Sequence, residues 1–64
     1  MEAKWDHCFA GWATHRAHSV SAATMTLLGT PLYNEAKKRF MGGACERVAF
    51  QLLDMAMASV NPKL

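Results

Sequence analysis

A helix predicted over residues 44–60 is apolar on almost every side. Spaced at about 100° per residue, its main stripe comprises Met41, Cys45, Val48, Leu52 and Ala56, widened by Ala49, Leu53 and Val60. Phe50 and Met57 lie on nearly the opposite side. A helix that is apolar all round is normally buried from several directions, and a chain of 64 residues can hardly surround one of its own helices. The pattern therefore predicts a partner, most simply a second copy of the chain.

The two sides of this helix are predicted to have different neighbours. We expect the side that carries Cys45, Val48, Leu52 and Ala56 to meet the other helices of the same chain. The remaining apolar residues, Phe50, Leu53 and Met57, then form a patch that no helix of the chain covers. We interpret that patch as the surface for self-association.

Two further helices are predicted upstream. The first spans residues 5–28, with an apolar arc at helical spacing made of Trp5, Phe9, Trp12, Val20, Ala23 and Leu27. The second spans residues 31–41. Gly29 suits the left-handed position after a helix, Thr30 suits an N-cap, and Pro31 suits the first helical turn.

The fold class that follows is all-α, in one domain over residues 1–64, because no strand-like alternation appears. We favour three helices that assemble into an oligomeric helical bundle. The alternative is a two-helix hairpin in which the last two helices join through Gly42 and Gly43. Two glycines inside a helix cost about 1 kcal/mol each, which favours three helices.

Composition supports assembly and argues against several other classes. Hydrophobic residues make up 52% of the chain and charged residues only 19%, more apolar surface than a core this small can hide. There is no signal-peptide pattern and no long apolar run, so we expect no membrane span. With only two cysteines, Cys8 and Cys45, we expect free core thiols in a reducing cytoplasm.

Three residues near the start of the chain are candidates for partner contact. Trp5 and Trp12 form an aromatic cluster with Phe9 at one end of the first helix, which suits either a core or a binding anchor. Arg16 stands inside the apolar arc. It either pairs with a carboxylate, Glu46 or Asp54, or lays its stem on the stripe with its guanidinium in water.

The polar side of the first helix carries the remaining candidates. We expect the face with His7, Thr14, His18 and Met25 to point outward. His15 and His18 are three residues apart and offer two metal ligands, fewer than the three or four that a zinc site needs. A metal or small-ligand site here requires a second chain to complete it.

Basic residues suggest a second alternative. Lys37, Lys38, Arg39 and Arg47 are able to contact phosphates as in a helix-turn-helix protein. A net charge of only +2 makes a nucleic-acid partner the weaker hypothesis.

The function predicted from these features is a small, non-enzymatic interaction module. No phosphate loop, catalytic triad or paired carboxylate is present, so we expect no catalytic activity and no cofactor. We expect a homo-oligomer, most simply a dimer, that acts as an inhibitor, adaptor or regulator by binding another protein. Many such chains are encoded by phages and other mobile elements. The alternatives are a dimeric DNA-binding regulator and an intersubunit metal- or small-ligand-binding protein.

Overall fold

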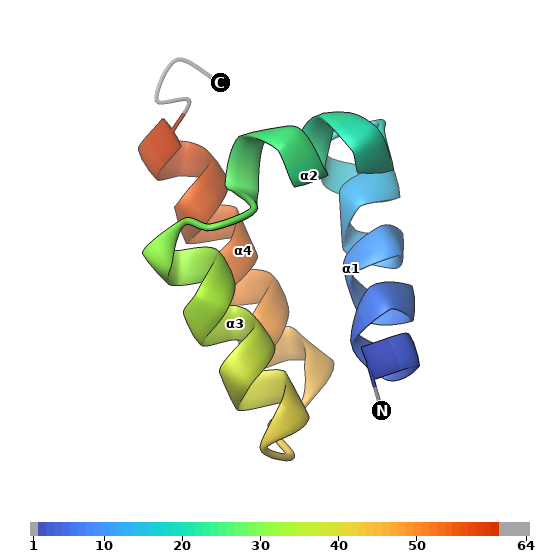
Figure 1. Ribbon diagram of the computed structural model, residues 1–64, viewed down its shortest axis with the longest axis vertical. Coiled ribbons are helices and arrows are strands. Elements are labelled where there is room, and N and C mark those ends of the chain that lie inside the picture. The colour runs from blue at the N-terminus through green and yellow to red at the C-terminus, as the bar shows by residue number, and fades with distance from the viewer. Residues whose placement is uncertain (1, 61–64) are drawn as a thin grey trace.

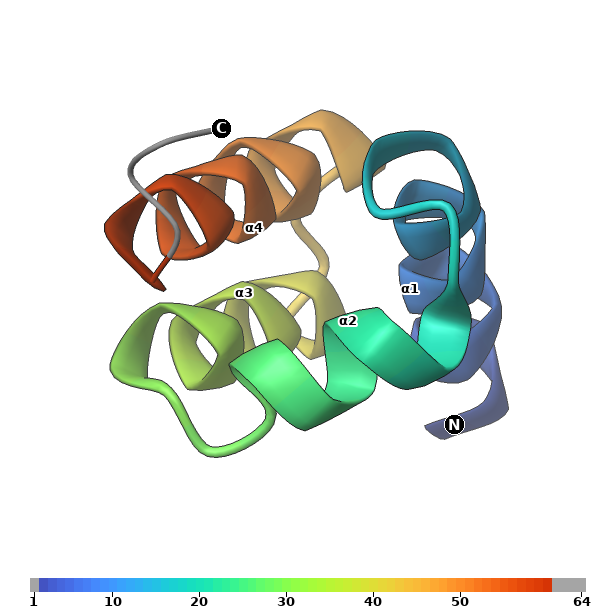
Figure 2. The same ribbon diagram turned by 90° about the horizontal axis from the view of Figure 1, so that it is seen from above.

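Four helices and no strand make up the part of the chain that the computed structural model describes, residues 2–60. They are α1 (Glu2–Arg16), α2 (Val20–Leu27), α3 (Pro31–Met41) and α4 (Glu46–Val60). Helices α3 and α4 form an antiparallel pair, α1 lies along one side of it, and α2 crosses one end (Figures 1 and 2). The all-α class is confirmed, whereas the prediction of three helices is wrong by one.

The extra helix arises because the segment predicted as one helix over residues 5–28 is broken after Arg16. His18 adopts a φ of 62°, in the left-handed region, where histidine is one of the more frequent non-glycine residues. Ser19 then caps α2, and its hydroxyl oxygen accepts a hydrogen bond from the backbone N–H of Ala22 at 3.2 Å. Because the apolar spacing continues across the break, helical periodicity alone predicts one helix where the structure has two.

The turn between α2 and α3 forms as its sequence predicts. Gly29 has a φ of +88°, and Thr30 is the N-cap of α3. The hydroxyl oxygen of Thr30 accepts a hydrogen bond from the backbone N–H of Tyr33 at 3.3 Å, and Pro31 begins the helix. This turn reverses the chain so that α3 runs back beside α1 (Figure 1).

Gly42 and Gly43 separate α3 from α4, so the alternative of one continuous helix is wrong. The Gly42 N–H donates to the Lys38 carbonyl at 3.0 Å and closes the last turn of α3. Gly43 follows with a φ of +105°, a conformation that glycine adopts without steric cost. The chain then starts α4 at Glu46, two residues later than predicted.

Aromatic side chains of α1 and α3 form the centre of the core. Trp5 meets Tyr33 with ring centroids 5.6 Å apart, and Phe9 meets Tyr33 at 5.4 Å, in both cases edge to face. The buried hydrophobic residues are Trp5, Cys8, Phe9, Trp12, Ala13, Ala23, Leu27, Tyr33, Ala36, Ala49, Leu53 and Ala56. Val20, which was predicted to share the apolar arc, is 40% exposed.

Helix α4 turns a different side to the core from the one predicted. Ala49, Leu53 and Ala56 are buried, with Leu53 0% exposed. Of the stripe expected to face inward, Ala56 is buried, but Val48 and Leu52 are half-buried and Cys45 is exposed. Alanines on α3 and α4 let the two helix axes approach closely, which the apolar spacing of α4 alone does not reveal.

The two neighbouring leucines of α4 provide a test of this orientation. Leu53→Ala should lower the free energy of unfolding by about 2–5 kcal/mol, the usual cost of emptying a fully buried leucine site. Leu52→Ala should cost clearly less because Leu52 is half-buried. Urea unfolding followed by circular dichroism, at low micromolar protein concentration, measures both. Equal losses for the two variants would contradict this orientation of α4.

Candidate interaction surfaces

One candidate surface lies along the side of α4 that was expected to be internal. We call it the outer strip, and it consists of Cys45, Val48, Leu52 and Met55. Met55 is 55% exposed, Cys45 is exposed, and the other two are half-buried. All four side chains are apolar or weakly polar, so the helix keeps an apolar side that its own chain leaves partly in solvent.

The second candidate surface is the outer side of α2. We call it the α2 patch, and it consists of Met25 and Leu28, the residue that caps the helix, which are 86% and 62% exposed. Val20 is 40% exposed but lies about 140° around α2 from Met25, so it is not part of the patch. Residues 19–34, which include this patch, carry no charged side chain and no histidine. The exposure predicted for Met25, together with His7, Thr14 and His18, is confirmed. Val20 and Leu28 were missed, and the N-cap at Ser19 was the available signal that α2 is a separate helix.

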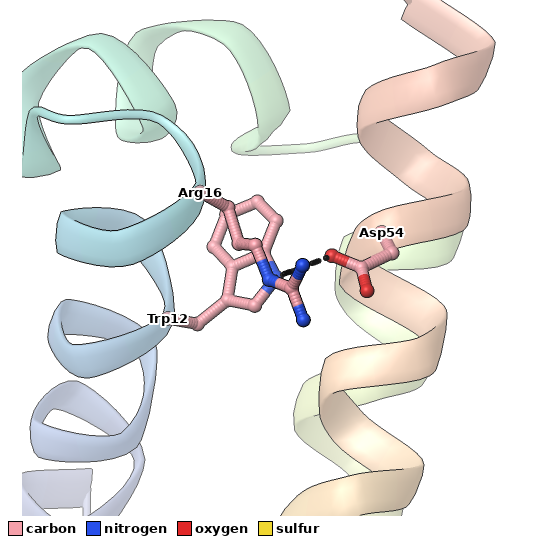
Figure 3. A network of polar contacts seen from close by, with 3 residues as sticks. All are labelled: Trp12, Arg16 and Asp54. Carbon is pink, nitrogen blue, oxygen red and sulfur yellow. Dashed lines mark hydrogen bonds and ion pairs between the residues drawn. The ribbon is translucent and has the colours of Figure 1, made fainter.

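A small polar network joins α1 to α4 (Figure 3). The Trp12 Nε1–H donates a hydrogen bond to Asp54 Oδ1 at 2.8 Å, and the Arg16 Nε lies 3.7 Å from the same oxygen. The Trp12 side chain is almost fully buried, whereas the Arg16 and Asp54 side chains are 57% and 43% exposed. The hydrogen bond gives a buried donor its partner, and the ion pair closes the network at the surface.

This network shows how the charge of Arg16 is accommodated. Its partner is Asp54, one of the two carboxylates proposed for it, and its guanidinium also reaches water. Glu46 instead lies beside Cys8. An exposed ion pair of this kind contributes about 0–1 kcal/mol, so Arg16 remains accessible to a partner at the edge of the α1–α4 contact.

Three residues predicted to contact a partner are internal. Trp5 and Trp12 are each 1% exposed, and Leu53 is 0% exposed. The folded chain presents none of them at its surface. For Trp5 and Trp12 this burial supports the core alternative, and partner contact at the three residues stays a prediction. Phe50 and Met57 are half-buried and pack against the core cluster. The chain therefore covers much of the patch that was expected to lie bare.

The basic residues do not all carry uncompensated positive charge, because Arg39 is paired with a carboxylate. Arg39 donates from Nε to Glu35 Oε2 at 2.6 Å, one turn away on α3. This hydrogen bond lowers the pKa of Glu35, which keeps the carboxylate charged beside the arginine. Lys38 and Arg47 are exposed and Lys37 is half-buried.

His15 and His18 do not share one helical face, because the helix that was predicted to contain both of them ends at Arg16. His15 lies in the last turn of α1, and His18 lies beyond the helix with its positive φ. Among residues 2–60, no three histidine, cysteine or acidic side chains come together as metal ligands. A pocket of about 320 Å³ lies elsewhere, lined by Lys4, Phe40, Met41, Gly43 and Ala44.

The two thiols have opposite environments. Cys8 is buried as predicted, and burial, followed by the nearby Glu46 carboxylate, raises its pKa to about 11. Cys45 was predicted to lie in the core but is exposed just before α4. Hydrogen bonds from the backbone N–H groups of Val48 and Arg47 lower the pKa of Cys45. Both cysteines are free.

Comparison with known proteins gives no information about these surfaces. No protein-family model, no curated protein and no solved structure matches the chain. Within residues 2–60, no helix combines the length and the apolar character needed to cross a lipid bilayer.

The Trp12–Asp54 hydrogen bond should matter more for stability than the Arg16–Asp54 ion pair. Asp54→Ala leaves the buried indole N–H without an acceptor and should lower the free energy of unfolding by about 1–3 kcal/mol. Arg16→Ala should cost no more than about 1 kcal/mol. Asp54→Asn retains a carbonyl acceptor and should recover part of the loss. Thermal and urea unfolding measure the series, and a larger cost for Arg16→Ala than for Asp54→Ala would contradict this ranking.

Cys45 should be the reactive thiol of the folded protein. Because its pKa is lowered, its alkylation by iodoacetamide should reach half of its maximal rate at a lower pH than that of the same cysteine in the unfolded chain. Cys8, with a pKa raised to about 11, should react only when the chain unfolds. Mass spectrometry of peptides labelled between pH 6 and 10 separates the two sites. Labelling of Cys8 as fast as Cys45 under native conditions would contradict this assignment.

Proposed function

We propose that the protein is a small, non-enzymatic interaction module that binds another protein through the α2 patch and acts as an inhibitor, adaptor or regulator. The observation that carries this proposal is the exposure of Met25 and Leu28 within a charge-free segment. A methionine that is 86% exposed adapts its shape to an apolar partner surface. Exposed apolar groups of this kind mark protein contacts when they gather on one face.

The chemistry of the patch favours a protein over a nucleic acid. Residues 19–34 offer no cation for a phosphate, and phosphate contacts dominate binding to DNA. Of the basic residues that DNA binding would use, Arg39 already shares its charge with Glu35 on the same helix. The α2 patch therefore suits an uncharged, apolar surface on its partner.

Position-specific crosslinking tests the proposal. A photoreactive phenylalanine analogue in place of Met25 should capture one defined protein in an extract of the source cells. The matched control carries the same group at Lys38, which is exposed but charged, and should capture none. Excess unlabelled chain should displace the partner, whereas Met25→Lys should compete at least about tenfold less well.

Three outcomes would count against the proposal. They are equal capture from positions 25 and 38, equal competition by Met25→Lys, and capture of only a second copy of the chain. A crosslinked product that nuclease removes would instead favour the nucleic-acid alternative.

A further inference from the structure

The pocket of about 320 Å³ lies at the end of the molecule opposite α2, and we call it the turn pocket. Its lining comes from the start of α1, the last turn of α3 and the turn before α4, as Lys4, Phe40, Met41, Gly43 and Ala44. The start of α1 and the α3–α4 turn lie at one end of the bundle, and α2 crosses the other end (Figure 1). The volume is at the lower limit of the clefts that bind small molecules in proteins.

The wall of the turn pocket is held in place by backbone hydrogen bonds. The N–H groups of Gly42, Gly43 and Ala44 donate to carbonyls in the last turns of α3 at 3.0, 3.1 and 3.0 Å. A Cβ at Gly43 would meet no atom within 4 Å beyond its chain neighbours, and Ala44 carries only a methyl group. The turn therefore leaves the space beside it unfilled, and the pocket is formed by the folded chain itself, as small-molecule sites usually are.

Two apolar side chains form much of the lining. Phe40 is half-buried, and its ring packs against the ring of Trp5 with centroids 5.8 Å apart. Because Trp5 is 1% exposed, this contact holds Phe40 against the close-packed core. Met41 is 42% exposed, and its thioether side chain adapts to the shape of a bound group. Together they suit a ring or a short chain of carbon atoms.

One positive charge stands at the turn pocket. Lys4 is exposed, and its ammonium takes part in no ion pair within residues 2–60. It is the charged residue of the lining. In small-molecule sites an apolar surface with a few polar groups is common, and the polar groups fix the orientation of the ligand. A ligand with an apolar body and one negative charge therefore complements the turn pocket.

The donors at the pocket favour a carboxylate over a phosphate. Phosphate sites usually supply several backbone N–H groups, as at the N-terminus of a helix that follows a glycine-rich loop. Here the N–H groups of Gly42, Gly43 and Ala44 are already used within the turn. The Lys4 ammonium is then the charged donor of the lining, and a single ammonium balances a single carboxylate.

We propose that the turn pocket binds a small monocarboxylate, with the apolar body of the ligand on Phe40 and Met41 and its carboxylate at Lys4. The site is separate from the α2 patch because the two lie at opposite ends of the molecule (Figure 1). It stands whether or not that patch binds another protein, and the crosslinking test at Met25 succeeds or fails independently of it.

A titration with three matched ligands tests the proposal. Phenylpropionate, phenylpropanol and phenylpropylammonium share one apolar body and differ in the charge of the head group. In heteronuclear NMR of the isotope-labelled chain at low ionic strength, phenylpropionate should give saturable shifts of the Met41, Gly43 and Ala44 amides. Phenylpropanol should bind about threefold to fivefold more weakly, the contribution of an exposed ion pair, and phenylpropylammonium more weakly still. Added salt should reduce the difference between the first two ligands.

Substitutions at the pocket test the role of Lys4. Lys4→Gln should weaken the binding of phenylpropionate by about threefold to fivefold and leave the binding of phenylpropanol unchanged. The matched control is Lys38→Gln, at an exposed lysine outside the pocket lining, and it should change neither. Met41→Glu should reverse the order of phenylpropionate and phenylpropylammonium. Because Lys4, Lys38 and Met41 are exposed, all three variants should keep the circular dichroism of the wild type.

Each alternative result overturns the proposal. Shifts that do not saturate, or that map to Met25 and Leu28 instead of residues 40–44, exclude a site in the turn pocket. Equal affinity for the three ligands excludes a site that selects a carboxylate. Equal effects of Lys4→Gln and Lys38→Gln, with both variants folded, exclude Lys4 as the partner of the carboxylate.

Discussion

The attachment of α1 to the α3–α4 pair holds the whole domain together. Two buried indoles make it: the Trp5 N–H donates to the Tyr33 hydroxyl at 3.1 Å on α3, and the Trp12 N–H donates to Asp54 at 2.8 Å on α4. Each ring supplies a large apolar surface and has its one polar group satisfied. One helix is thereby bonded to both members of the pair, and α2 is left as the link that spans their end.

The sequence predicted those parts of the fold that depend on local chemistry. The bounds of α3 and the cap at Thr30 follow from residues within one turn of each other, and the structure has them as predicted. The break at His18 was missed because the apolar spacing of α1 continues by coincidence into α2. The core side of α4 was missed for a different reason: Leu52 and Leu53 are equally apolar, and only the packing of α3 and α1 distinguishes them.

The sequence predicts an apolar contact surface on α4, but the residues that it expects at that surface are not the ones that the structure leaves exposed. An excess of apolar residues on the last helix predicts an interface there, and that stays a prediction. The structure leaves Met55 exposed on this helix, whereas Leu52 is half-buried and packs against the core. The folded chain buries both tryptophans together with alanines of α3 and α4, and it leaves Met25, Leu28 and Met55 exposed. Short domains of this kind have little interior, so part of their apolar surface is available for contacts between molecules.

The placement of the two tryptophans makes the protein its own optical reporter. Each buried indole touches a different helix of the α3–α4 pair through its N–H, and the chain holds only these two tryptophans. Fluorescence from Trp5 therefore senses the contact of α1 with α3, and fluorescence from Trp12 senses its contact with α4. Single-tryptophan versions of the chain would let the separation of α1 from each neighbour be followed independently during unfolding.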